Sequence, residues 1–155
     1  MVVELIKDCE IEETCDMIQK TCKKSFDGYY PEEWVKYTIS RQTVERIREK
    51  ANKMSFYVAK EVDKIIGCGA IGEYYGRKDE SCIFSFFVLP EYQGKGVGKA
   101  IMKRLEEDEF FNRAKKVYVP SSVPAIPFYK KMGYDFVGGK MIFDDGSFLL
   151  EKLKK

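Results

Sequence analysis

A long apolar run leads directly into a glycine-rich turn in the second half of the chain, and this feature constrains the fold most. Residues 82–89 (CIFSFFVL) are almost continuously apolar, and Pro90 ends the run. Such a run is typical of a central strand that is buried on both faces. Three alternating glycines follow within residues 94–98, and apolar residues then recur at helical spacing from about Gly96 to Arg113. The chain is therefore predicted to pass from a buried strand through a tight turn into a helix.

The remaining pattern predicts a mixed α/β domain. Helical and strand-like spacings of apolar residues alternate along the chain, with turn residues between them. We expect a strand at 2–6, helices at about 11–26, 31–37 and 42–52, a hairpin of strands at 56–59 and 65–71, the central strand at 82–89, a helix at about 96–113, a strand at 116–119, a short helix at 124–132, and two strands around the turn at 144–146. No repeat or long linker divides the sequence, so we predict a single domain over residues 1–155.

Composition excludes several classes of function. The chain contains no histidine, which excludes Ser-His-Asp and Cys-His triads and every metal site that uses histidine. Its formal net charge of +2 creates no strong field for nucleic acid or an anionic membrane. The five cysteines include no C-x-x-C pair, so we expect reduced, mostly buried thiols and no metal site. No apolar run approaches the roughly 20 residues that cross a bilayer, and residues 1–8 lack the layout of a secretory signal. We therefore expect a cytoplasmic protein that binds neither nucleic acid nor membrane.

The glycine-rich turn is suited to hold a phosphate group. Its glycines lack Cβ atoms, and the first N–H groups of a helix have no internal partner and lie at the positive end of the helix dipole. Lys95 and Lys99 can add positive charge. The dinucleotide pattern G-x-G-x-x-G fails because Lys99 or Ile101 stands at its third glycine. The P-loop pattern fails because Gln93 replaces its first glycine and Ala100 its hydroxyl residue. Without a ligand, the same glycines would only permit a tight turn.

Two segments resemble one known family. Gln93-Gly94-Lys95-Gly96-Val97-Gly98 resembles the cofactor motif Q/R-x-x-G-x-G/A of the GNAT superfamily of acetyl-CoA-dependent N-acyltransferases. One helix and one strand downstream, residues 122–134 (SVPAIPFYKKMGY) resemble the family's N-x-x-A-x-x-F-Y-x-K-x-G-F/Y helix. Ser122 stands where the family commonly has Asn, and its hydroxyl can still donate a hydrogen bond. The predicted order of elements also suits the family, so the resemblance spans nearly the whole chain.

The resemblance implies a fold, an activity and a set of binding residues. The implied fold is the GNAT fold, with a mixed, mostly antiparallel central sheet flanked by helices. The implied enzyme is an N-acetyltransferase that moves acetyl from acetyl-CoA directly to a primary amine of a small molecule or peptide. The amides of residues 94–99 would hold the pyrophosphate, the strand would bind the pantetheine arm, and an N–H near Val88 would polarise the thioester carbonyl. The expected cofactor-binding residues are Phe86, Phe87, Val88, Gln93, Gly94, Lys95, Gly96, Val97, Gly98, Lys99, Ser122 and Phe128.

The resemblance also assigns catalytic roles. Tyr129 is the expected general acid that protonates the leaving thiolate. A phenol has a pKa near 10 and a thiol one near 8.5, so this transfer is modestly uphill unless the surroundings lower the phenol's pKa. Alternatively, Tyr129 is only an aromatic packed beside Phe128. Without histidine, the base must be a carboxylate, another phenol or a relayed water. Glu73, at the end of the third strand, is the first choice, with Glu80 and Ser85 as alternatives.

The acceptor is not identified by the sequence. An aromatic cluster at Phe26, Tyr29, Tyr30 and Trp34 either encloses an amine-bearing substrate or simply packs together. No acidic patch indicates a polyamine or an aminoglycoside. Two rival functions stay open: an acyltransferase with a longer acyl-CoA or a hydroxyl acceptor, and a non-catalytic module that binds or senses acyl-CoA. Many relatives dimerise, so a homodimer also stays open.

Overall fold

The computed structural model describes residues 1–154, and short 3₁₀ turns connect several of its helices and strands. These follow in the order β1 (Val2–Leu5), α1 (Ile11–Ser25), α2 (Glu32–Ser40), α3 (Val44–Lys53), β2 (Ser55–Glu61), β3 (Lys64–Tyr74), β4 (Arg77–Val88), α4 (Val97–Leu105), α5 (Glu109–Asn112), β5 (Lys116–Ser122), α6 (Ile126–Lys131), β6 (Asp135–Phe136), β7 (Phe143–Asp144) and β8 (Ser147–Leu153).

The strands form one mixed sheet, as predicted. Their order is β1-β2-β3-β4-β5-β8-β6, and β7 pairs with β8. The β4–β5 pair is parallel and the other pairs are antiparallel. The mixed α/β architecture with a mostly antiparallel sheet is therefore confirmed.

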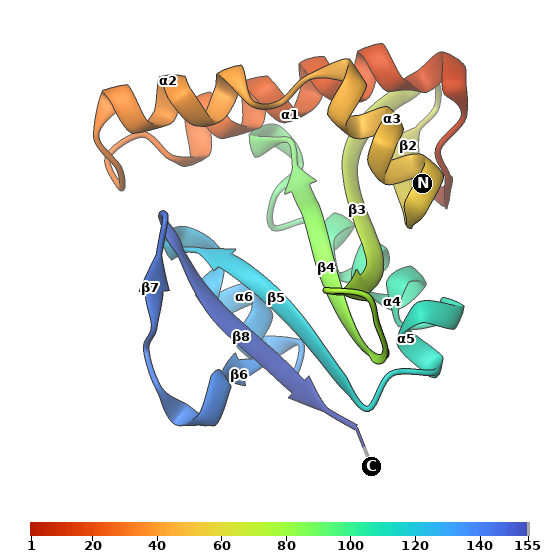
Figure 1. Cartoon of the computed structure of the whole chain (residues 1–155). Coiled ribbons are helices and arrows are strands. Elements are labelled where there is room, and N and C mark those ends of the chain that lie inside the picture. Colours follow the sequence, from red (N-terminus) through yellow and green to blue (C-terminus); the bar gives the residue numbers. More distant parts are fainter. Residues whose placement is uncertain (155) are drawn as a thin grey trace.

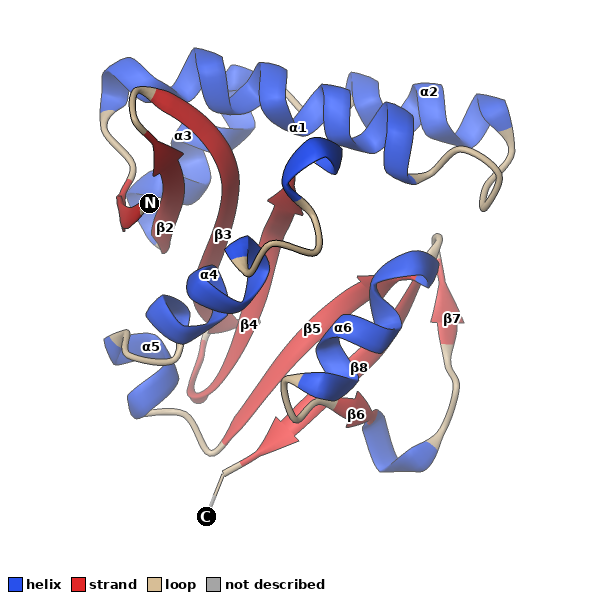
Figure 2. Ribbon diagram, turned by 180° about the vertical axis from the view of Figure 1, so that it is seen from behind, coloured by secondary structure: helices blue, strands red, loops and turns tan. Residues whose placement is uncertain are grey.

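Helices cover both faces of the first half of the sheet (Figures 1 and 2). A Cβ atom added at Gly67 or Gly69 of β3 would meet Ile101 of α4, whereas one at Gly72 would meet Met54, which follows α3. Because these positions alternate along the strand, α4 and α3 lie on opposite faces. The glycines let both layers approach the sheet closely. The apolar faces of the helices bury the core between them, with Ile18, Ile66 and Ile101 fully buried.

The sheet opens between its two central strands. β4 and β5 pair only where residues 80–82 meet residues 116–118, and beyond this point the strands diverge (Figure 1). A bulge lies just past the last pair, because Ala70 opposes Phe84 while Cys68 opposes Phe87. Ser85, within the bulge, has a φ of +51°. The divergence leaves one edge of β4 without a neighbouring strand.

Several boundaries differ from the sequence-based expectations. The helix expected at about 96–113 is two helices, because Asp108 caps α5 by accepting a hydrogen bond from the Phe110 N–H (2.9 Å). The strand expected from residue 82 begins at Arg77, and three strands, rather than two, follow α6. Residues 84–88 of the apolar run, expected to be buried on both faces, are only half-buried, since they border the opening between β4 and β5 instead of a neighbouring strand.

No helix in the part of the chain that the structure describes is long and apolar enough to span a membrane.

Candidate functional site

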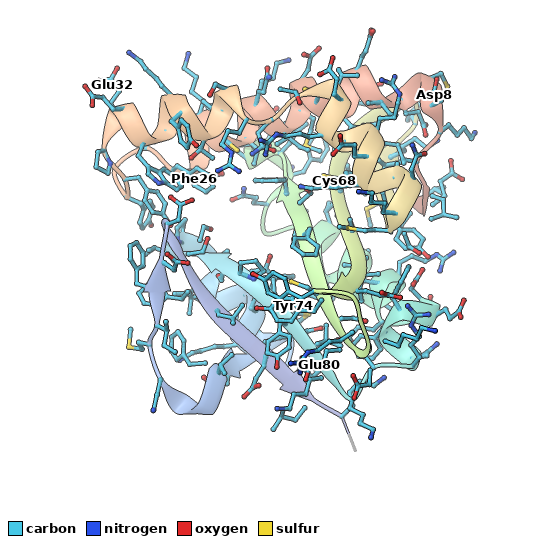
Figure 3. The ribbon with its side chains drawn as sticks, in the orientation of Figure 1. Asp8, Phe26, Glu32, Cys68, Tyr74 and Glu80 are labelled. Atoms are coloured by element: carbon cyan, nitrogen blue, oxygen red, sulfur yellow. The ribbon has the colours of Figure 1, made fainter. Side chains whose placement is uncertain are left out.

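The opening between β4 and β5 is a cavity of about 810 Å³. Its walls are β4 and β5, the helices α1, α2 and α3, the glycine-rich turn, α6, and the turn between β7 and β8. In Figure 3, Tyr74 and Glu80 mark the end where the two strands still pair, and Phe26 lies toward the open end. The volume is in the range of cavities that hold small molecules and cofactors.

The glycine-rich turn presents unpaired N–H groups to the cavity. Gly94 and Gly96 have φ values of +76° and +86°, and Gly96 is the N-cap of α4. The helical bonds of α4 begin with the Ala100 N–H donating to the Gly96 carbonyl, so the N–H groups of residues 97–99 have no helical partner. A Cβ atom at Gly94 or Gly96 would meet nothing within 4 Å, which leaves open space over the turn. The residues present therefore fit a phosphorylated ligand such as coenzyme A.

The backbone of Val88 also faces the cavity. The Leu89 N–H donates to the Ile66 carbonyl, so Leu89 and Ile66 are a hydrogen-bonded pair of the β3–β4 ladder. Such positions alternate along antiparallel strands, so Val88, opposite Gly67, directs its N–H and carbonyl away from β3. The Gln93 side chain occupies the carbonyl by donating from Nε2 (2.9 Å). The Val88 N–H thus points toward the edge that β5 leaves open.

Tyr129 of α6 is 3% exposed and lines the cavity. Its hydroxyl makes no hydrogen bond to residues 1–154. Because every fully buried side-chain oxygen of those residues has a partner, we infer that the hydroxyl oxygen is open to the cavity. Its ring packs edge-on against Phe86 and Phe128. Burial raises the pKa of Tyr129 above its ordinary value, which keeps the phenol protonated at neutral pH. The direction is opposite to the lowering that would make proton transfer to a thiolate less uphill.

Aromatic residues join the two halves of the sheet at the open end of the cavity. Tyr30 stacks on Trp34, with ring centroids 4.1 Å apart. The Tyr30 hydroxyl donates to the Gly146 carbonyl in the β7–β8 turn and accepts from the Val123 N–H (2.9 Å). Trp34 lies against Gly146, where a Cβ atom would collide with its ring. This cluster therefore packs together as part of the fold and also encloses the cavity, because Phe26 and Trp34 line it.

The wall formed by α2 and α3 carries positive charge. Arg41, Arg46 and Lys50 line the cavity there, and Lys50 Nζ donates to Ser85 Oγ in the β4 bulge (2.6 Å). Burial, and then the guanidinium groups of Arg46 and Arg41, lower the pKa of Lys50. The only carboxylate among the described lining residues is that of Asp145, 4.0 Å from Arg41.

The structure brings most of the predicted site residues to this cavity. Those that line it are Phe86, Phe87, Val88, Gln93, Gly94, Gly96, Gly98, Lys99, Ser122, Phe128 and Tyr129. The Val97 side chain is instead buried in the core, and Lys95 Nζ lies over the Tyr92 ring (5.6 Å). Only the backbone amides of these two residues can serve the turn.

Glu73 lies away from the cavity. Its carboxylate accepts a hydrogen bond from the Arg113 guanidinium (2.8 Å), on the side of the sheet where α5 packs. The alternative base Glu80 pairs with Arg77 (3.6 Å) and does not line the cavity, whereas Ser85 does. The role of Glu73 as the general base stays a prediction. Its carboxylate is paired with Arg113 and not with another predicted site residue.

The sequence did not reveal the cationic wall, which is the wall of the cavity that carries Arg41, Arg46 and Lys50. Residues 42–52 read as a surface helix, since charges surround Val44, Ile47 and Ala51. Arg46 and Lys50 are four residues apart and so share one face of a helix, but spacing alone does not say that this face borders a cavity. That depends on the divergence of β4 from β5.

Comparisons with known proteins agree with this geometry. Residues 16–134 match the model of the acetyltransferase (GNAT) family. The uncharacterized N-acetyltransferase YjcF of Bacillus subtilis (strain 168) is 30% identical over an alignment of 143 residues that covers 89% of this chain and 97% of that protein.

Solved structures show the same fold. The PaiA N-acetyltransferase of Thermoplasma acidophilum, in complex with coenzyme A, matches with a TM-score of 0.83, 18% identity and 99% of each chain covered. A GNAT-family acetyltransferase of Staphylococcus aureus Mu50 matches with a TM-score of 0.75, 15% identity and 99% of each chain covered. From the family match and the curated relative, the chain belongs to the GNAT family of acetyltransferases, enzymes that use acetyl-CoA as the acyl donor.

Proposed function

We propose that the whole chain acts as one domain that transfers acetyl from acetyl-CoA to a primary amine in the cavity between β4 and β5. One observation carries the proposal: Tyr129 lines the same cavity as the glycine-rich turn, whose first helical N–H groups have no helical partner. Acetyl-CoA, when bound, supplies the acetyl group as a thioester. The amine nitrogen bonds to the acetyl carbon, the carbon–sulfur bond breaks, and one proton passes in net from the amine to the sulfur.

The turn and Val88 would hold and polarise the donor. The N–H groups of residues 97–99, at the positive end of α4, are suited to the pyrophosphate, with Lys99 adding charge from the cavity wall. The Val88 N–H points into the opening, where it can donate to the acetyl oxygen as negative charge develops there. Because Gln93 donates to the Val88 carbonyl, the Val88–Leu89 peptide group, next to the one that carries this N–H, is held in place.

Tyr129 would protonate the departing sulfur. Its hydroxyl lacks a competing partner among residues 1–154, so its proton is available to a group in the cavity. Burial raises the pKa of Tyr129, but the same burial raises the pKa of a thiol that leaves inside the cavity. The two shifts act in the same direction, so the transfer stays modestly uphill rather than prohibitive.

The proton of the attacking amine needs a different route. Glu73 is ion-paired with Arg113 outside the cavity, and Asp145 is held near Arg41. We therefore propose that water in the cavity, rather than Glu73, accepts the amine proton and passes it to solvent.

The test is a Tyr129→Phe variant assayed by release of free thiol from acetyl-CoA in the presence of amines. We expect turnover to fall by roughly 10²- to 10⁴-fold while acetyl-CoA affinity, measured by calorimetry, stays within about twofold. Tyr74→Phe, which alters a tyrosine outside the cavity lining, is the matched control and should keep wild-type turnover. Wild-type turnover in Tyr129→Phe would leave Tyr129 a packing residue. Tight acetyl-CoA binding by the wild-type protein with no transfer to any amine would favour a non-catalytic acyl-CoA-binding module.

A further inference from the structure

The acceptor side of the cavity has an unusual balance of charge. Arg41 follows α2, and Arg46 and Lys50 lie one turn apart on α3, so three cationic groups converge on one wall. The only carboxylate of a described residue in the whole lining is that of Asp145, at the exposed tip of the β7–β8 turn. A cavity wall of this kind attracts an anion and repels a cation.

Two of the three cations have no ionic partner in the structure. No carboxylate of residues 1–154 lies within 4.0 Å of the Arg46 guanidinium or the Lys50 ammonium. Lys50 is half-buried, and its recorded hydrogen bond goes to the neutral Ser85 hydroxyl. Arg48, on the same helix but outside the cavity, is by contrast paired with Asp8 at 3.5 Å. Because Lys50 is partly desolvated, its unpaired charge costs free energy unless a ligand supplies the counter-charge.

These cations are not placed to serve the cofactor phosphates. The glycine-rich turn leads into α4, which covers the face of the sheet toward which Gly67 and Gly69 open. α3 covers the opposite face, and Lys50 reaches Ser85 from that side. The cationic wall and the phosphate-binding turn therefore approach the opening from opposite faces of the sheet.

We propose that Arg41, Arg46 and Lys50 bind an anionic group, a carboxylate or a phosphate, on the amine that accepts the acetyl group. The proposal rests on the acetyltransferase function proposed above and narrows its substrate class to small amines that also carry negative charge. A guanidinium group pairs with carboxylates and phosphates in a two-point geometry, which would also orient the amine toward the opening between β4 and β5. Polycationic acceptors such as polyamines and aminoglycosides would meet like charge on this wall.

The experiment compares acceptors of matched size with and without the anionic group, and kcat/KM is expressed per unprotonated amine because removing the anionic group also lowers the pKa of the amine. The purified chain, saturated with acetyl-CoA, is assayed by thiol release with a panel of L-amino acids and their carboxamides, and with O-phosphoethanolamine and ethanolamine. The two arms distinguish a carboxylate from a phosphate. We expect the charged member of at least one pair to have a kcat/KM about tenfold or more above that of its neutral partner, the size of one charge-assisted hydrogen bond.

Variants assign this preference to the wall. Arg46→Gln removes one charge at an exposed position, so it should fold normally, and it should reduce the preference for the charged acceptor by about tenfold. Arg48→Gln removes a charge from the same helix outside the cavity and should leave the preference unchanged. Acetyl-CoA affinity should be equal in both variants and the wild type. A loss of acetyl-CoA affinity in Arg46→Gln would assign the wall to the cofactor and overturn the proposal.

The single tryptophan, Trp34, gives a second readout that does not need turnover. It lines the acceptor side, so its fluorescence in the coenzyme A-saturated protein should respond to N-acetylated amino acids more strongly than to their amides. Equal kcat/KM for charged and neutral acceptors, or a preference for polyamines, would overturn the proposal while leaving acetyl transfer intact. If no amine of either kind reacts and Trp34 fluorescence does not discriminate acid from amide, the proposal is likewise overturned. Failure to bind acetyl-CoA would instead refute the proposed function itself.

Discussion

Gly96→Ala tests the role of the glycine-rich turn with a control that the chain itself provides. Gly96 has a φ of +86° with nothing within 4 Å of an added Cβ atom, and Gly76, in the β3–β4 turn, has a φ of +73° and equally open space. The left-handed conformation costs a residue with a Cβ atom roughly 1–2 kcal/mol at either position. For a chain of this length, that cost lowers Tm by about 2–8 °C. Both variants should therefore lose similar stability.

Only Gly96→Ala should weaken cofactor binding, because Gly96 lines the cavity and Gly76 does not. Its methyl group would displace the ligand from the unpaired N–H groups at the start of α4. Loss of one charge-assisted hydrogen bond is worth about 1.5–3 kcal/mol, which corresponds to a roughly 10- to 150-fold rise in the Kd for acetyl-CoA. Calorimetric titration measures the Kd and thermal melting the Tm. Equal acetyl-CoA affinity in Gly96→Ala and Gly76→Ala, at matched Tm, would refute the assignment of the turn.

Two further substitutions test hydrogen bonds that stabilise the fold. Tyr30→Phe removes the hydroxyl that links the Gly146 carbonyl to the Val123 N–H, so Tm should fall by about 2–8 °C in a melting scan, whereas Tyr29→Phe, at an exposed ring, should leave it unchanged. Burial and the Asp108 carboxylate raise the pKa of Tyr57 to about 12, above its ordinary value near 10. The protonated Tyr57 hydroxyl therefore stabilises the fold below pH 10, and this stabilisation is lost as the pH rises toward 12. Between pH 9 and pH 11 the Tm of Tyr57→Phe should therefore fall less than that of the wild type. An equal fall in both proteins would contradict the raised pKa of Tyr57.

Much of the cofactor side of the site could be predicted from the sequence, because its signals are local. The order of glycines in the turn, the apolar run that precedes it and the helix with Phe128 and Tyr129 depend on neighbouring residues. In the structure they meet at one cavity. The unbroken helix expected at 96–113 fails for a non-local reason as well: Asp108 caps α5 and also accepts from the distant Tyr57 hydroxyl (2.5 Å).

The proposed acceptor side, which is the cavity wall with Arg41, Arg46 and Lys50, could not be predicted, because it depends on long-range geometry. Arg46 and Lys50 border a cavity only because β4 diverges from β5 after Cys82 and bulges at Ser85. The sequence places Glu73 at the end of a strand, but nothing in it indicates that Arg113, forty residues later, binds its carboxylate. The local sequence pattern therefore does not predict which partner a charged side chain at the end of a strand will bind.

The central claim is that the cavity between β4 and β5 binds acetyl-CoA for transfer, and calorimetric titration of the purified chain tests it most directly. Acetyl-CoA is titrated beside ATP and NAD, which share its adenosine and 5′-diphosphate unit but not its pantetheine arm. The account predicts micromolar binding of acetyl-CoA, worth about 8 kcal/mol, and none of comparable strength for ATP or NAD. Absence of acetyl-CoA binding, or equal binding of all three ligands, would contradict it.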